Sequence, residues 1–146
     1  MDASIQRLSA DNVERLQRIA PDVFDFPIDP TQLQAFLDDP RHSMVIAVVD
    51  DTVVGMASAV EYFHPDKQPQ MWVNEIGVTP EHQRQGVGRR LLEALLKISI
   101  DRGCVFAWLG TDVNNKAAQA CFQSVAGGAS PQPFLLYEWH LSGRPE

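Results

Sequence analysis

The sequence has only two cysteines, no long hydrophobic run and few basic residues, and each shortage excludes a class of protein. Cys104 and Cys121 are too few and too far apart for a disulfide framework or a four-ligand zinc site, so we expect two reduced thiols. No stretch approaches the roughly 20 apolar residues that a membrane span needs. Twelve Lys and Arg against 19 Asp and Glu leave a net charge of −7, which argues against nucleic acid or an anionic membrane as partner and favours a cationic ligand.

Signals for secretion, metal binding and division into domains are also missing. Residues 1–4 carry no basic segment and no apolar segment follows them, so we expect a soluble, cytoplasmic protein. The four histidines show no ligand spacing, so no metal site is expected. No repeat and no linker interrupts the 146 residues, which favours a single domain over 1–146.

The order of hydrophobic patterns predicts an α/β fold with a mixed sheet. Apolar runs and alternation predict strands at 4–8, 44–49, 53–62, 71–78, 105–109 and 134–141. Apolar residues at helical spacing predict helices at 13–19, 31–37, 87–98 and 116–125. Three prolines and three aspartates between Pro21 and Pro30 predict a loop, with Phe24 and Phe26 as apolar anchors.

Two glycines stand at the head of the longest predicted helix, directly after a strand and a proline turn. The stretch is Glu75-Ile76-Gly77-Val78-Thr79-Pro80-Glu81-His82-Gln83-Arg84-Gln85-Gly86-Val87-Gly88-Arg89-Arg90. The first amides of a helix lack intrahelical partners, and the helix dipole favours an anion there. Gly86 and Gly88 let the main chain approach a diphosphate closely, and the arginines add positive charge. A Walker loop and a dinucleotide fingerprint would need other spacings, and neither is present.

This stretch resembles the coenzyme A-binding signature of the GNAT N-acetyltransferase superfamily: Gln or Arg, any two residues, Gly, any residue, then Gly or Ala. Gln83, Gly86 and Gly88 match it. The resemblance implies a GNAT-like fold, whose central, mostly antiparallel mixed sheet is split by a V-shaped cleft between the strands at 71–78 and 105–111 and flanked by helices. It also implies acetyl-coenzyme A as cofactor. The cofactor-binding residues that follow from it are Ile76, Gly77, Val78, Gln83, Arg84, Gln85, Gly86, Val87, Gly88, Arg89 and Asn114.

Two of these residues could equally serve the fold alone. The resemblance implies a β-bulge at Gly77, but a lone glycine in a strand can also allow a close approach of another backbone. The resemblance also matches Asn114 to an asparagine that contacts pantetheine. Asn114 or Asn115 can equally cap the helix that follows without any ligand.

Within the superfamily, the chain is most similar to the small aminoglycoside 3-N-acetyltransferases. Three features carry this likeness: Asp51-Thr52-Val53-Val54-Gly55, the acidic Glu75, and Glu81-His82-Gln83-Arg84-Gln85-Gly86. It implies a small, cationic amine as partner and the 3-amino group of an aminoglycoside as acceptor. A polyamine, a small metabolite amine or a peptide N-terminus is an alternative, as is a domain that binds acyl-coenzyme A without catalysis. The sequence does not decide whether the chain forms a homodimer.

The acceptor side has acidic candidates. An alkyl ammonium must lose a proton before it attacks a thioester, and Glu75 is the predicted base, unless it only positions the substrate or pairs with an arginine. Asp25 and Asp112 are predicted to line an acidic substrate entrance, although a solvated acidic loop explains the aspartates of 22–29 equally well.

The resemblance places the oxyanion donor at a strand amide near Ile76. It also places a tyrosine, as proton donor to the leaving thiolate, where this chain has Phe122. Tyr137 is therefore predicted for that role, with Tyr62 and solvent as alternatives. Either tyrosine can instead be a packing aromatic.

Overall fold

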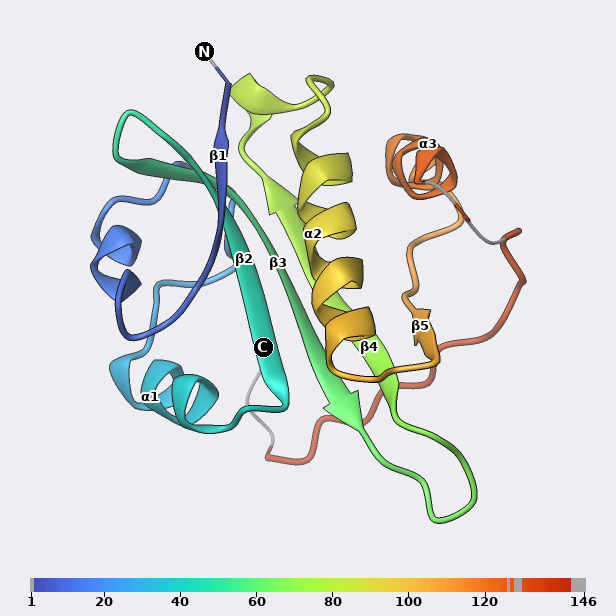
Figure 1. Ribbon diagram of the computed structural model, residues 1–146. Coiled ribbons are helices and arrows are strands. Elements are labelled where there is room, and N and C mark those ends of the chain that lie inside the picture. Colours follow the sequence, from blue (N-terminus) through green and yellow to red (C-terminus); the bar gives the residue numbers. More distant parts are fainter. Residues whose placement is uncertain (1, 126, 128–129, 143–146) are drawn as a thin grey trace.

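The computed structural model describes residues 2–125, 127 and 130–142 and is built around a five-stranded sheet (Figure 1). The sheet has the order β1-β2-β3-β4-β5. Neighbours are antiparallel from β1 to β4, whereas β5 runs parallel to β4, so the predicted mixed α/β fold is confirmed. The strands are β1 (Ser4–Arg7), β2 (His42–Val49), β3 (Thr52–Tyr62), β4 (Gln70–Val78) and β5 (Phe106–Trp108).

Helices lie on both faces of the sheet. They are η1 (Val13–Gln17), α1 (Pro30–Asp38), η2 (Pro80–His82), α2 (Val87–Asp101) and α3 (Lys116–Ser124). Because side chains alternate along a strand, Val45 packs with Leu91 of α2, whereas Met44 and Ile46 pack on the other face with Leu33 of α1. Among the described helices, none has the length and apolar character that crossing a bilayer requires.

The loop before α1 ends in a helix cap. The Asp29 carboxylate accepts hydrogen bonds from the amides of Thr31 and Gln32 at 2.8 and 3.1 Å. Pro30 takes the first helical position, where its missing N–H costs nothing. The predicted helix at 31–37 is therefore confirmed, whereas the one predicted at 13–19 is only the short 3₁₀ turn η1.

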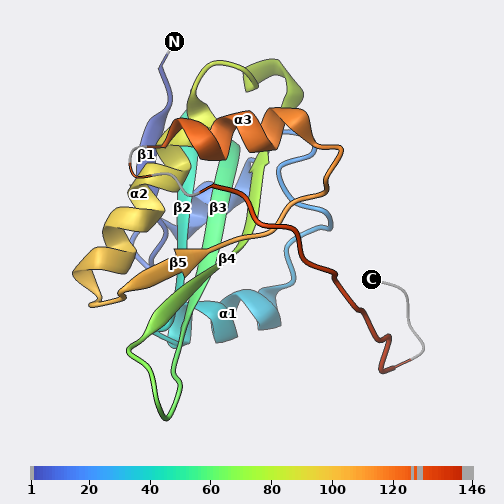
Figure 2. The same ribbon diagram turned by 90° about the vertical axis from the view of Figure 1, so that its right-hand side faces the viewer.

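The strand predicted at 134–141 is wrong. This segment has no helical or strand assignment, and it runs past β5 and away from the sheet (Figure 2). Its large apolar side chains are exposed, including Leu135, Trp139 and Leu141. Alternation marks residues that suit a strand, but a strand forms only where a partner edge supplies its hydrogen bonds.

An extra residue interrupts the pairing of β4 with β3. Ser58 pairs with Glu75 and Ala59 with Val73, so Asn74 has no partner and forms a β-bulge. The bulge shifts the alternation of β4 by one residue. Val73 belongs to the core cluster beneath α2, and Ile76 packs against that same cluster. Glu75 is thereby placed on the opposite face.

The bulge expected at Gly77 is therefore in the wrong place, because Gly77 pairs regularly with Met56. Its lack of a side chain has a different reason. A Cβ on Gly77 would meet the carbonyl oxygen of Val23 far inside contact distance, because the loop before α1 crosses β4 there. The absence of a side chain at Gly77 thus allows that loop to pack directly on the strand that carries Glu75.

Replacing Gly77 tests this close approach. We expect Gly77→Ala to lower the free energy of unfolding by about 1–3 kcal/mol, because the added methyl forces the loop off β4. Chemical denaturation measures this change in the free energy of unfolding. The control is Gly88→Ala in the first turn of α2, whose new Cβ would lie 3.4 Å from Cys121 Sγ, an ordinary contact; it should not lower the free energy of unfolding, because alanine suits a helix better than glycine. Equal stabilities of the two variants would contradict the close packing.

Candidate active site

The strands β4 and β5 pair over three positions and then separate. The pairs are Gln70 with Phe106, Met71 with Ala107 and Trp72 with Trp108. The rings of Trp72 and Trp108, 4.0 Å apart at their centroids, close this end of the opening. Beyond them, a cavity of about 310 Å³ lies between β4, the residues after β5 and α3. This is the V-shaped opening expected between the two strands.

Most of the walls of this first cavity come from four segments, and Met56 of β3 adds to them. β4 contributes residues 73–77, and the segment after β5 contributes 109–111. Ala118 and Phe122 come from α3, and Asp22, Val23 and Asp25 come from the loop before α1. Ile76 and Gly77, predicted to face the cofactor, line it.

A second cavity, of about 790 Å³, lies on the other side of Glu75. Its walls are η1, the loop at 24–29, α1 and Met44 of β2. Among the described residues, only Asp25 and Glu75 line both cavities. The shift caused by the bulge is what turns the Glu75 carboxylate toward this meeting point rather than toward α2.

The surroundings of Glu75 favour its neutral form. Partial burial removes water from the carboxylate and raises its pKa, and the negative charge of Asp25 raises that pKa further. A carboxyl group of this kind accepts a proton more readily than an ordinary surface glutamate. The two acidic groups also attract a positively charged ligand to the point where the cavities meet.

The loop between β4 and α2 exposes a row of main-chain amides. Arg84 and Gly86 have positive φ values of 62° and 80°, which fold the chain into a turn at the head of α2. Within the described part of the chain, none of the amides of residues 84–89 donates a hydrogen bond. Successive free amides at a helix start form an anion-binding concavity, so this loop suits a diphosphate.

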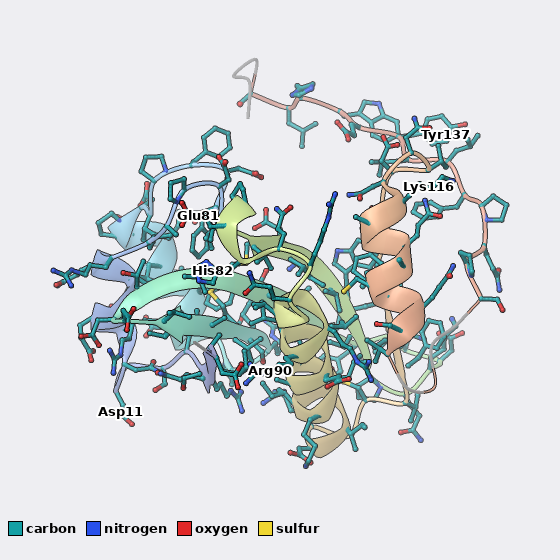
Figure 3. The ribbon with its side chains drawn as sticks, turned by 90° about the horizontal axis from the view of Figure 1, so that it is seen from above. Asp11, Glu81, His82, Arg90, Lys116 and Tyr137 are labelled. Atoms are coloured by element: carbon teal, nitrogen blue, oxygen red, sulfur yellow. The ribbon has the colours of Figure 1, made fainter. Side chains whose placement is uncertain are left out.

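The glutamines of this loop have structural contacts. Gln83 Nε2 donates to the Val78 carbonyl at 2.9 Å, and Gln85 Nε2 donates to the Glu81 carbonyl at 3.2 Å. Their side chains therefore fix the shape of the loop, and an anion would meet their main-chain amides. Figure 3 looks down on this loop, which contains Glu81 and His82, and on Arg90 of α2.

Charge around these amides comes from three exposed arginines. Arg89 pairs with Glu93 at 2.8 Å along α2. Arg84 and Arg90 take part in none of the ion pairs within the described residues, so both guanidinium groups are available to an anion.

Neither candidate tyrosine lies beside Glu75. Tyr137 is 69% exposed, and its ring lies 6.3 Å from that of Trp139, outside the walls of both cavities. The Tyr62 hydroxyl accepts a hydrogen bond from Trp108 Nε1 at 2.6 Å and donates to Gln70 Oε1 at 2.9 Å. Its proton is engaged at the paired end of β4.

Two further predicted residues hold a turn instead of lining a cavity. Asp112 Oδ1 accepts from the Asn114 amide at 2.7 Å, and neither residue belongs to the cavity walls. Asn115 caps α3 by accepting from the Ala118 amide at 3.0 Å, and it lines the first cavity.

Sequence reasoning missed Asn74 and Thr111 as wall residues. Thr111 follows the end of a predicted strand, which is a signal that points to the opening. Nothing in the sequence marks Asn74, because its position depends on the register with β3.

Comparison with known proteins places most of the chain in one family. The model described as acetyltransferase (GNAT) family matches residues 10–127. N-alpha-acetyltransferase RimI of Mycobacterium tuberculosis is 32% identical over 124 residues, which are 84% of this chain and 76% of that protein. L-2,4-diaminobutyric acid acetyltransferase of Marinococcus halophilus is 30% identical over 82 residues, 56% of this chain and 46% of that protein. The match thus spans about half the length of the latter relative.

Solved structures share the fold. An aminoglycoside acetyltransferase from an uncultured soil metagenomic sample, in complex with sisomicin, superposes with a TM-score of 0.79 at 21% identity, covering 94% of this chain and 96% of that one. The aminoglycoside N-acetyltransferase AAC(6')-Iy in complex with CoA gives 0.74 at 19% identity, covering 94% of each chain.

The electrostatics at the meeting point can be measured directly. We expect the Glu75 carboxyl, followed by NMR titration, to have a pKa above the ordinary range of glutamate, and Asp25→Asn to lower it because a like charge is removed. Asp66→Asn, in the exposed β3–β4 loop, is the matched control and should leave the Glu75 titration unchanged. An identical Glu75 pKa in Asp25→Asn and in the wild type would contradict the coupling.

Proposed function

This chain belongs to the GNAT acetyltransferase family, and from that premise we propose that it transfers the acetyl group of acetyl-coenzyme A to a primary amine. One observation carries the proposal: Glu75 lies where two cavities meet, one between the separating strands and one against the loop before α1. The first cavity suits the acetyl end of the cofactor and the second suits the acceptor. A carboxylate between them can take the proton that the amine must lose.

The cofactor side is formed mainly by backbone. The free amides of residues 84–89 would hold the pyrophosphate, with Arg84 and Arg90 adding charge. The edge of β4 at Ile76 to Val78, which β5 leaves uncovered, would pair with pantetheine. Acetyl-coenzyme A supplies the activated thioester, and an amide near Ile76 would stabilise the oxyanion that forms when the amine attacks.

Glu75 would act as the base, directly or through one water. Its raised pKa brings the carboxylate closer to the acidity at which proton transfer near neutral pH is most efficient. Asp25 would help to draw the ammonium toward Glu75. The ammonium would first give one proton to Glu75, and the free amine would then attack the thioester carbonyl. The nitrogen loses its second proton to solvent as the C–S bond breaks and the amide forms.

The leaving thiolate would receive no proton from the side chain at position 122. Phe122 lines the first cavity at the position where the family pattern has a tyrosine. A thiol with a pKa of about 8.5 is a fair leaving group near neutral pH, so solvent can complete the step. Tyr137 stays a prediction for this role, and Tyr137→Phe tests it.

The acceptor predicted from the sequence, the 3-amino group of an aminoglycoside, is one arm of the test. Asp25 supports a cationic acceptor, whereas Asp112 does not line either cavity. A polyamine, a small metabolite amine and a peptide N-terminus are the other arms. Thiol release from acetyl-coenzyme A across these amines separates them from a domain that only binds the cofactor, which would gain thermal stability but release no thiol.

Removing the base tests the proton route. We expect Glu75→Gln to lower kcat by roughly 100-fold or more, because the amide cannot accept the proton, with the Kd for acetyl-coenzyme A little changed. Steady-state kinetics and calorimetry measure the two quantities. Unchanged turnover would remove Glu75 from the mechanism.

A substitution that distorts the turn carrying the free amides tests the cofactor site. We expect Gly86→Val to abolish binding of acetyl-coenzyme A, because the φ of 80° is strained for valine and the turn must rearrange. Gly103→Val is the matched control: it lies just beyond the other end of α2 with a φ of 84° and open space around it, so it introduces the same strain away from the amides. If Gly86→Val bound the cofactor as well as Gly103→Val, the assignment would be wrong.

A further inference from the structure

We propose that the acceptor is a primary amine with a single positive charge on an apolar body the size of an aromatic ring. This inference rests on the proposed function, because it takes the second cavity as the place where the acceptor binds. At about 790 Å³, that cavity lies within the usual range for small-molecule sites, so a body larger than a short alkyl chain fits it.

The walls of the second cavity are predominantly apolar. Of the twelve described residues that line it, eight are aliphatic, aromatic, proline or methionine. Phe24 and Phe26 come from the loop, Leu33 and Phe36 from α1, and Leu16 from η1. Phe26 is 62% exposed, so a ligand can cover its ring without displacing any part of the core. An apolar body bound here removes both its own surface and that of Phe26 from water.

The few polar groups of this cavity leave room for one ammonium. Asp29 accepts two amide hydrogen bonds through Oδ1 as the cap of α1, so its negative charge is already offset by the positive end of that helix. Of the acidic residues in the wall, this leaves Asp25 and Glu75, which line both cavities. Gln32 is the remaining polar residue of the wall, and it carries no charge.

This arrangement disfavours a ligand with many polar groups. An aminoglycoside carries several ammonium and hydroxyl groups, and a polyamine carries several ammonium groups. Bound with one nitrogen at Glu75, either would place its other polar groups against apolar side chains, where they lose hydrogen bonds to water without new partners. A monocationic amine with an apolar body loses none of these interactions.

A panel of amines tests the proposal. The arms are 2-phenylethylamine, a tripeptide amide that begins with Phe, propylamine, spermidine and kanamycin, with thiol release from acetyl-coenzyme A giving kcat/KM for each. We expect the better of the two aromatic amines to exceed propylamine by roughly tenfold or more, because a ring is buried in the transition state. The first two arms also distinguish a free amine from the first residue of a peptide.

A variant pair ties the preference to the wall. We expect Phe26→Ala to lower the kcat/KM ratio of 2-phenylethylamine to propylamine by roughly threefold or more. Phe63→Ala removes a ring with almost the same exposure, 61%, from the residues after β3 and outside the cavity, and should leave the ratio unchanged.

The outcomes separate this inference from the proposed function. A higher kcat/KM for kanamycin or spermidine than for both aromatic amines would overturn the apolar acceptor and leave the acetyltransferase in place. So would a ratio that Phe26→Ala does not change. If no amine in the panel released thiol while acetyl-coenzyme A still bound, the proposed function would itself fail, and the inference with it.

Discussion

The site depends on one extra residue in β4. Without the bulge at Asn74, regular alternation would send the side chain of Glu75 into the core beneath α2, where a carboxylate without a partner is costly. With it, Ile76 takes the core position and Glu75 faces the loop before α1. In the proposed mechanism the same strand serves both sides of the reaction, because its free edge faces the opening toward β5 and its outer face carries the carboxylate to the second cavity.

Features that depend on local backbone requirements were predictable from the sequence. The change from a period of about two to one of 3.6 located β4 and α2, and the glycine at 86 marked a turn that the structure builds with a positive φ. The order of the elements predicted the mixed sheet, and the resemblance to the GNAT superfamily implied the opening between β4 and β5. Glu75 was singled out as a candidate base because it is an acidic residue in the strand that flanks the expected opening, and because the resembling enzymes are acidic at the matching position.

Features that depend on pairing between distant segments were not predictable from the sequence. The register of β4 with β3 decides where the bulge lies, and the course of the loop through Val23 decides why Gly77 has no side chain. The segment at 134–141 has the alternation of a strand, yet within the described residues no strand pairs with it. Asp112 and Asn114 show a local effect instead: the Asp112 carboxylate accepts from the main-chain N–H of Asn114 in a turn, and neither residue lines a cavity.

The two halves of the proposed site, one for the cofactor and one for the acceptor, are built from different chemical groups, and this affects how such an enzyme evolves. The cofactor half relies on main-chain amides and an open strand edge, which most point mutations leave intact. The acceptor half relies on side chains between Phe24 and Asp29, in a loop whose backbone packs closely on β4 at Val23. Acceptor preference can therefore drift through single substitutions in that loop while the grip on the acyl donor is inherited unchanged.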